Sequence, residues 1–99
     1  MPAYIISDVT VKDPAAFEAY RSRAAVSIAQ HGGRYLVRGG AVERLEGGWS
    51  PHPIIVIEFP DSERARAWYR SREYARALEF HDQALSRNLI LVEGVAPPA

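Results

Sequence analysis

Short segments of apolar and β-branched residues recur along the chain and predict four strands. They cover residues 3–9, 34–38, 54–59 and 89–95. The glycines at positions 39 and 40 allow a turn or bulge after the second segment, and residues 42–46 are expected to continue extended. A loop rich in glycine and proline, at residues 47–53, then leads to the third strand.

Between the first two strands, the spacing of apolar residues changes to that of a helix. Asp13 is a typical N-cap residue, and Pro14 suits the first helical position because the N–H that it lacks would have no helical partner there. Gly32 can adopt the positive φ that ends a helix. One face of this predicted helix carries Phe17, Tyr20, Ala24 and Ile28.

A second helical region follows the third strand and is predicted in two pieces. Pro60, Asp61 and Ser62 close the strand and cap the first piece, and residues 70–72 interrupt it. A further helix is expected over about residues 73–86. Its inward stripe would consist of Tyr74, Leu78, Phe80 or His81, and Leu85.

The predicted order of elements is β-α-β-β-α-β, which is typical of a ferredoxin-like α+β fold. We expect one domain over residues 1–99, with a four-stranded antiparallel sheet in the order 4-1-3-2 and the helices on one face. Residues 54–57 are all aliphatic, which indicates a strand covered on both faces. Because the helices cover only one face, we expect a homodimer through the other. A charge at whichever of Ile55 or Ile57 faces the partner should disrupt it.

Composition narrows the functional classes. The 12 basic residues balance the 12 acidic ones, so no net field favours nucleic acid or a membrane surface. The chain has no cysteine, no apolar run near the ~20 residues of a membrane span, and no signal-peptide pattern at its start. We therefore expect a soluble cytoplasmic protein. The three histidines lack metal-ligand spacing, and no phosphate-binding or dinucleotide-binding glycine motif is present, so neither a metal nor a cofactor is expected.

Four blocks of sequence stand in order at residues 32–40 (GGRYLVRGG), 56–60 (VIEFP), 68–74 (WYRSREY) and 92–94 (VEG). Together they resemble the bacterial family known as domain of unknown function 1330. The resemblance implies a dimeric α+β barrel, whose superfamily includes antibiotic-biosynthesis monooxygenases, muconolactone isomerases and chlorite dismutases. This chain departs from the family pattern at Arg72, where proline is usual, and at His81, where arginine is frequent. A ligand anion bound by that arginine in relatives would meet a histidine here.

Two histidines are the first candidates for catalysis. The spacing from Phe17 places His31 on the inward side of the first helix, at its last turn, and His81 lies seven residues beyond Tyr74. Two inward histidines would suit proton transfer in a pocket between helices and sheet. The simpler interpretation, which we favour for each alone, is a helix-capping His31 and a half-buried His81 bonded to a neighbour.

Arg38 and Glu58 are expected on neighbouring strands. Either they form a cross-strand ion pair, or Arg38 anchors a ligand carboxylate while Glu58 acts as a general base or orients the arginine. Arg38 alternates with Tyr35 and Val37 along the strand. It is therefore predicted to share a face with Leu36.

Three aromatic residues complete the predicted site. Tyr69 and Tyr74 either offer hydroxyls to a ligand or belong to the core. Trp49 either caps a pocket or lies at the dimer interface, which is the position we favour. The expected function is the binding of a small acidic or aromatic molecule between helices and sheet. The alternatives are a cofactor-independent isomerase, lyase or monooxygenase, and a dimerisation module without a ligand.

Overall fold

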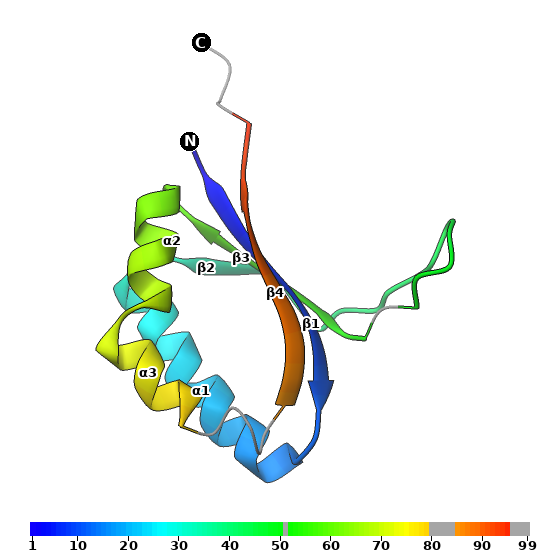
Figure 1. Cartoon of the computed structure of the whole chain (residues 1–99), viewed down its shortest axis with the longest axis horizontal. Coiled ribbons are helices and arrows are strands. Elements are labelled where there is room, and N and C mark those ends of the chain that lie inside the picture. Colours follow the sequence, from blue (N-terminus) through cyan, green and yellow to red (C-terminus); the bar gives the residue numbers. More distant parts are fainter. Residues whose placement is uncertain (51, 80–84, 96–99) are drawn as a thin grey trace.

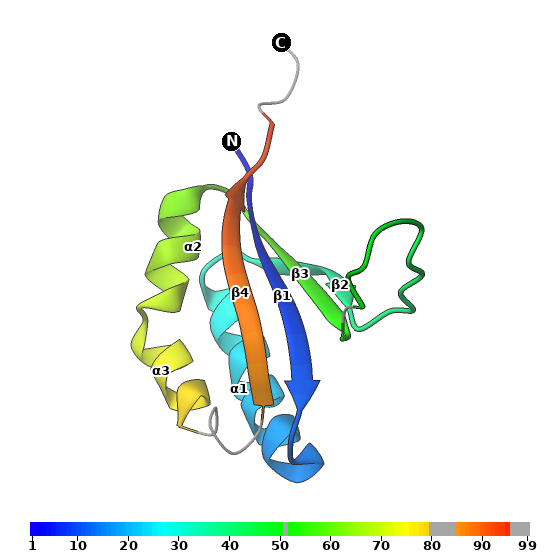
Figure 2. The same cartoon turned by 45° about the vertical axis from the view of Figure 1, so that its right-hand side comes forward.

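The computed structural model describes residues 1–50, 52–79 and 85–95, and it confirms the predicted order of strands and helices. The elements are β1 (Ala3–Val11), α1 (Pro14–Gln30), β2 (Arg34–Arg38), β3 (Ile54–Phe59), α2 (Ser62–Tyr69), α3 (Arg72–Leu78) and β4 (Leu85–Glu93). The strands form one antiparallel sheet in the expected order, β2-β3-β1-β4. The described helices all lie on one side of this sheet (Figure 1), and the turned view in Figure 2 shows the same arrangement.

Alternation along β1 decides which side chains face the helices. The odd-numbered residues from 3 to 9 are buried, whereas the even-numbered residues are half-buried or exposed. Antiparallel pairing places Ile5 opposite Ile57 on β3 and opposite Leu91 on β4. Directly paired residues share a face, so the odd-numbered residues of all three strands face the helices. We call this the helix face of the sheet, and the opposite side the outer face.

The aliphatic run of β3 is divided between these two faces. Ile55 and Ile57 both belong to the helix face, so neither is the partner-facing position that the sequence led us to expect. Ile54 and Val56 belong to the outer face instead. The run is apolar on both sides, as predicted, but the residues on the uncovered side are the even-numbered ones.

The core lies between the helices and the helix face. Its largest fully buried side chains include Phe59, Trp68 and Tyr74. The ring centroids of Trp68 and Tyr74 are 4.2 Å apart, and those of Phe59 and Trp68 are 5.5 Å apart. These aromatic contacts join β3, α2 and α3 in one cluster, because each ring comes from a different element.

The helix ends follow the predicted signals. Asp13 caps α1 by accepting a hydrogen bond from the backbone N–H of Ala15 at 3.0 Å. Gly32 follows α1 with a φ of +79°. Asp61 caps α2, and the predicted interruption at residues 70–72 exists because Ser71 caps a new helix, α3.

The last strand and the third helix have different limits from those predicted. β4 begins at Leu85 instead of residue 89, and α3 ends at Leu78 instead of near residue 86. Leu85 pairs with Val11, so β4 accompanies β1 along its whole length. Pairing with a long neighbouring strand outweighs the helical spacing between Leu78 and Leu85.

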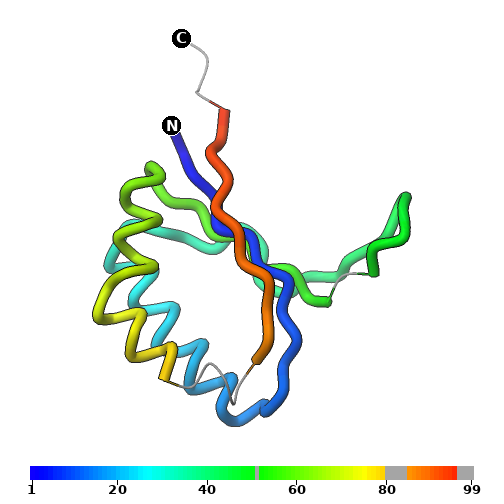
Figure 3. The backbone as a smooth tube through the Cα atoms, in the orientation of Figure 1, coloured from blue at the N-terminus to red at the C-terminus, as the bar shows by residue number. Residues whose placement is uncertain are grey.

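The connection between β2 and β3 projects from the body of the molecule (Figure 3). The segment at residues 42–46, predicted to continue extended, pairs with no strand in the part of the chain that the structure describes. Its apolar side chains are exposed, and Leu45 is 88% accessible to solvent. We call residues 39–50 the arm.

Gly33 tests the packing between the end of α1 and the sheet. A Cβ atom at this position would lie 2.7 Å from a ring carbon of Phe59 and 2.8 Å from Cγ2 of Ile28. We expect Gly33→Ala to lower the free energy of unfolding by about 1–3 kcal/mol because it overpacks the core. Chemical denaturation measures this change. Gly40→Ala is the matched control, since a Cβ there meets nothing within 4 Å. Equal stability of the two variants would contradict the expectation.

Candidate functional site

Three side chains from three different elements meet on the helix face of the sheet. Arg87, on β4, donates hydrogen bonds from its two terminal guanidinium nitrogens to the hydroxyls of Tyr20 on α1 and Tyr74 on α3. The two hydroxyl oxygens are hydrogen-bonded to each other at 2.8 Å. Arg87 pairs with Val9 of β1, which fixes its position on this face. We call these three residues the Arg87 cluster.

Arg87 gives this cluster a positive charge. Within the described residues, no carboxylate lies within ion-pair distance of Arg87. Its guanidinium carbon lies 5.3 Å and 5.6 Å from the ring centroids of Tyr20 and Tyr74, so the rings balance part of the charge. Burial acts to lower the pKa of Arg87, but the two tyrosines outweigh burial, and the pKa is raised. Arg87 therefore stays charged and can attract an anion.

Tyr74 remains protonated in this environment. Burial is the largest cause of its raised pKa, to which Tyr20 adds and which Arg87 opposes. Two neutral hydroxyls carry two hydrogens, and the bond between them uses one. When Tyr74 donates to Tyr20, the hydrogen of Tyr20 is left for another acceptor. Arg87 uses two of its five N–H groups on the tyrosines. The cluster thus retains donors suited to an anion.

A cavity of about 30 Å³ lies beside the cluster, between α1 and the sheet. Its walls are mainly aliphatic and aromatic, and all four strands and two helices contribute to them. The volume is sufficient for about one water molecule or a group of similar size. The polar residues that line it are Ser7, Tyr20, Arg21, Tyr35 and Arg87.

His31 occupies the helix-capping position that the simpler interpretation of the sequence predicted. It is the C-cap of α1, and its Nδ1 donates to the backbone carbonyl of Ser27, with the two atoms 2.9 Å apart. His31 is half-buried and does not line the cavity. Its ring therefore has a structural partner at the helix end, and a role in catalysis stays a prediction.

The expected pairing of Arg38 with Glu58 is wrong. Glu58 pairs with Arg34, whose Nε donates to the carboxylate at 2.9 Å on the outer face. Antiparallel pairing of Arg34 with Glu58 leaves Arg38 four residues farther along β2, and a β-bulge between residues 35 and 37 shifts the partner of Arg38 by one position. Arg38 consequently lies opposite Ile55, and its guanidinium carbon is 4.5 Å from the ring centroid of Tyr35.

The bulge also changes which residues of β2 share a face with Arg38. It shares the helix face with Tyr35, although strict alternation placed it with Leu36. Its side chain is exposed at the sheet edge, and it does not line the cavity. The structure does not bring His31, Arg38 and Glu58 together around this cavity. His81 lies outside the described residues.

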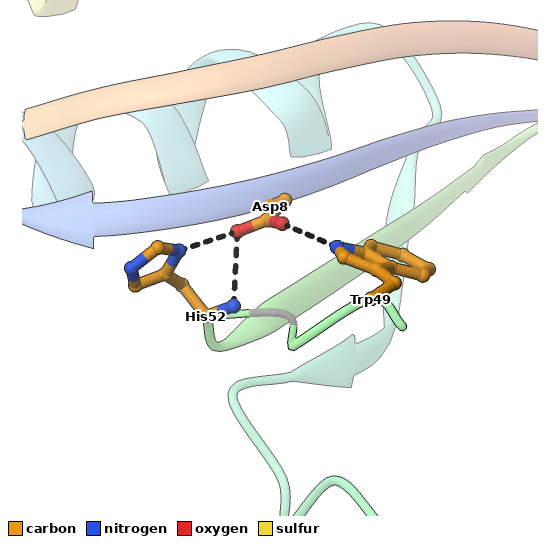
Figure 4. A network of polar contacts seen from close by, with 3 residues as sticks. All are labelled: Asp8, Trp49 and His52. Atoms are coloured by element: carbon orange, nitrogen blue, oxygen red, sulfur yellow. Dashed lines mark hydrogen bonds and ion pairs between the residues drawn. The ribbon is translucent and has the colours of Figure 1, made fainter. Parts of the chain in front are cut away.

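The three predicted aromatic residues occupy three different places. Tyr74 belongs to the Arg87 cluster, and Tyr69 is 49% exposed beside an open cleft between α2 and β4. Trp49 belongs to the arm, and Figure 4 shows its contact with β1: its indole Nε1 donates to Asp8 at 3.3 Å. The same carboxylate accepts from the backbone N–H of His52 at 3.2 Å. Asp8 pairs with outward-facing Ile54, so Trp49 is held at the outer face.

Sequence reasoning missed Tyr20, Ser7 and Arg87 as site residues. Tyr20 was recognised only as part of the inward stripe of a helix. Arg87 fell beside the predicted end of a helix, so its alternation with Leu85 and Leu89 was not used. If the last strand had been predicted to begin at Leu85, the alternation would have placed Arg87 on an otherwise apolar face. Ser7 had a weaker signal, a single hydroxyl in an apolar strand.

Within the ranges described, no group of three or more histidine, aspartate or glutamate side chains is placed to hold a metal ion. Likewise, no helix in these ranges is long and apolar enough to cross a membrane.

The fold is shared with several solved structures. A protein of unknown function from Rhodopseudomonas palustris matches with a TM-score of 0.76 at 18% identity, over 97% of this chain and 84% of that one. The cofactor-independent oxygenase SnoaB from Streptomyces nogalater has a TM-score of 0.62 at 15% identity, over 97% and 95% of the two chains. A dimeric protein of unknown function from Bacteroides fragilis, described as ferredoxin-like, has a TM-score of 0.61 at 12% identity, over 94% and 96%. At these identities the likeness shows the fold alone.

The chain belongs to the family described as Domain of unknown function (DUF1330), which it matches over residues 2–95. This confirms the resemblance found from the four sequence blocks. No curated protein sequence matches the chain.

Tyr74 gives the cluster a measurable pH dependence. Its pKa is raised in the folded state, so above about pH 10 the unfolded chain loses a proton that the folded chain keeps. The unfolded state is then favoured, and the free energy of unfolding falls by up to about 1.4 kcal/mol per pH unit. Below about pH 9 both states hold this proton, and the group contributes no slope.

Tyr74→Phe should therefore flatten the decline in stability between about pH 10 and pH 11, measured by urea denaturation at each pH. Some decline remains in the variant, because burial also raises the pKa of Tyr35. An equal slope in the two proteins would show that Tyr74 ionises in the folded state.

Proposed function

We propose that this member of the DUF1330 family binds a small carboxylate in the cavity beside the Arg87 cluster. The observation that carries the proposal is the guanidinium of Arg87, which is held by two neutral hydroxyls and has no carboxylate partner among the described residues. A half-buried cation with neutral partners leaves part of its charge uncompensated. A carboxylate accepts hydrogen bonds from guanidinium with good geometry, and it supplies the missing charge.

The cavity limits the size of the ligand. Its volume of about 30 Å³ is far too small for an aromatic ring and admits only the smallest acid groups. Aliphatic walls, including Ile28, Ile55 and Ile57, would contact an apolar remainder of the ligand. Of the acidic and aromatic molecules expected from the sequence, the geometry therefore favours small acids.

Binding is favoured over proton-transfer catalysis by the composition of the cavity wall. Within the described residues, the wall contains no histidine, aspartate or glutamate. Such a site has donors that stabilise negative charge but no group that acts as a base near neutral pH. A cofactor-independent isomerase, lyase or oxygenase would need its base from elsewhere.

Arg87→Gln tests the anchor. Thermal-shift measurements with acetate, propionate and larger carboxylates should show stabilisation of the wild type. A ligand at about 100 times its Kd adds about 2.7 kcal/mol, which is a shift of roughly 10–20 °C in a domain of this size. We expect Arg87→Gln to abolish this shift, because it removes the charge.

Arg72→Gln is the matched control, since this arginine is exposed on α3 and outside the cavity wall. Its shift should equal that of the wild type. Arg38→Ala tests whether Arg38, which the sequence suggested as the anchor of a ligand carboxylate, binds the ligand. Loss of binding in Arg38→Ala with retention in Arg87→Gln would move the site to the edge of the sheet and overturn the proposal.

We further propose that the protein forms a homodimer through the outer face. The register aligns four apolar residues across all four strands on that face, namely Val37, Val56, Ile6 and Ile90. Ile90 is 55% exposed in the single chain and Val37 is 39% exposed. A continuous aliphatic row on the uncovered face is typical of a surface buried against another subunit. A structural neighbour described as dimeric supports the same assembly.

Ile90→Lys should convert the dimer into a monomer. The position is half exposed in the single chain, so lysine leaves the subunit folded, whereas in the dimer it would bury an unpaired charge at a cost of several kcal/mol. Size-exclusion chromatography with light scattering at micromolar concentration measures the mass. Ala67→Lys on the exposed side of α2 is the control and should stay dimeric. A monomeric wild type would overturn the dimer.

A further inference from the structure

The arm is far longer than the connection between β2 and β3 requires. Residues 39–53 join these two antiparallel neighbours, whereas a hairpin turn takes about two to five residues. The arm also carries exposed apolar side chains. Leu45 is almost fully exposed, Trp49 is 63% exposed, and Val42 is exposed as well. Apolar side chains gathered on a projecting segment are typical of a protein–protein contact.

Hydrogen bonds to the sheet fix the base of the arm. The N–H of Gly39 donates to the carbonyl of Ile54 at 2.9 Å, which pairs the two ends of the connection. Asp8 accepts from the indole of Trp49 and from the backbone N–H of His52, as Figure 4 shows. Because these bonds reach back to β1 and β3, the sheet sets the direction in which the arm leaves it.

The arm projects on the side of the sheet that has no helices. In Figures 1 and 2 the sheet lies between the helices and the arm. A second subunit packed on the outer face would therefore fill the space beside the arm. Ile6 of the aliphatic row and Asp8, which holds the arm, are two residues apart on β1 and share the outer face. The arm thus continues the surface proposed to bind the partner.

The aliphatic row alone is small for a stable interface. A standard protein–protein interface takes about 20–30 residues from each partner, and the row supplies one residue from each of the four strands. The arm adds residues 39–50, including a tryptophan, a residue type enriched at interfaces. A two-fold axis would bring each arm to the opposite subunit, so every contact of the arm would occur twice.

The arm also forms an open hollow of about 360 Å³. Among the described residues, its walls come from the arm itself, and no helix or strand of the same subunit contributes to them. The apolar part of the wall consists of Val42, Leu45 and Trp49. A concave apolar surface that its own subunit leaves open suits a protruding side chain of a partner.

We infer that the arm of each subunit packs against the other subunit of the homodimer and that Leu45 and Trp49 are buried in this contact. The inference rests on the proposed dimer through the outer face. A second copy of this chain is the partner, because the direction of the arm and its continuity with the aliphatic row both lead to the space which that copy fills. The contact removes exposed apolar surface from water and so stabilises the dimer.

Leu45→Glu tests the arm without disturbing the core. The side chain is almost fully exposed in the single chain, so the variant should unfold at the temperature of a monomeric subunit. In the dimer it places a charge in an apolar contact on both subunits. We expect the Kd of the dimer to rise about a hundredfold or more, measured by analytical ultracentrifugation.

Val26→Glu is the matched control. Val26 is also apolar and exposed, but it lies on α1, on the opposite side of the sheet from the arm. The substitution adds the same charge, so it accounts for any general repulsion between subunits. Its dimer should have the Kd of the wild type.

A single thiol measures the burial of the arm directly. The chain has no cysteine, so Leu45→Cys and Val26→Cys each carry one reactive group. The rate of alkylation by iodoacetamide depends on access to the thiol. In dimeric Leu45→Cys the rate should be about tenfold lower, or less, than in the monomer obtained by adding Ile90→Lys. In Val26→Cys the rate should be the same with and without Ile90→Lys.

The outcomes separate this inference from the dimer on which it rests. If the wild type is dimeric but Leu45→Glu dimerises as tightly, or if the thiol of Leu45→Cys reacts equally fast in dimer and monomer, the arm does not contact the partner. The inference is then wrong, while the dimer through the outer face stands. A monomeric wild type, or a dimer that Leu45→Glu weakens and Ile90→Lys does not, would overturn the outer-face dimer itself.

Discussion

The hydrogen bonds from one guanidinium to two tyrosine hydroxyls hold α1 and α3 to the end of the sheet. Tyr20 comes from the second turn of α1 and Tyr74 from the first turn of α3, while Arg87 lies on an edge strand. Each of these residues would be costly to bury alone, because each carries a polar group. Together they hydrogen-bond one another, and no carboxylate among the described residues balances the charge of Arg87. That charge sets the chemistry of the neighbouring cavity.

The same alternation that buries the cluster also shapes the rest of the molecule. Odd-numbered residues of β1, β3 and β4 meet the helices, so the even-numbered residues must meet either water or another protein. Across the middle of the outer face they are aliphatic, whereas the Arg34–Glu58 ion pair lies toward one end and Asp8 toward the other. Asp8 ties the arm to the sheet through Trp49 and His52. The arm base and the aliphatic row therefore belong to one continuous surface.

Features with local causes were predictable from the sequence. The caps at Asp13 and Asp61, the interruption before α3 and the bounds of β2 and β3 all depend on residues within a few positions of each other. The order of strands followed from the order of elements. The bulge at Leu36 had no such signal, and a one-residue change of register moves every later side chain to the other face. The separation of Arg38 from Glu58 has another origin, the pairing of Arg34 with Glu58, which no local signal in the sequence showed.

The candidate site was harder to predict because its residues are defined by pairing between distant segments. Arg87 faces inward only because β4 begins at Leu85 and runs the full length of β1, a register that tertiary contact selects over local helical spacing. Once that register is set, Ser7 and Arg87 meet on one face although 79 residues intervene between them in sequence. Both depart from the apolar pattern of their strands, and both face the same cavity. Aliphatic residues at both positions would continue the apolar pattern of the helix face, so these two polar side chains are the departures from it that only the register of β4 reveals.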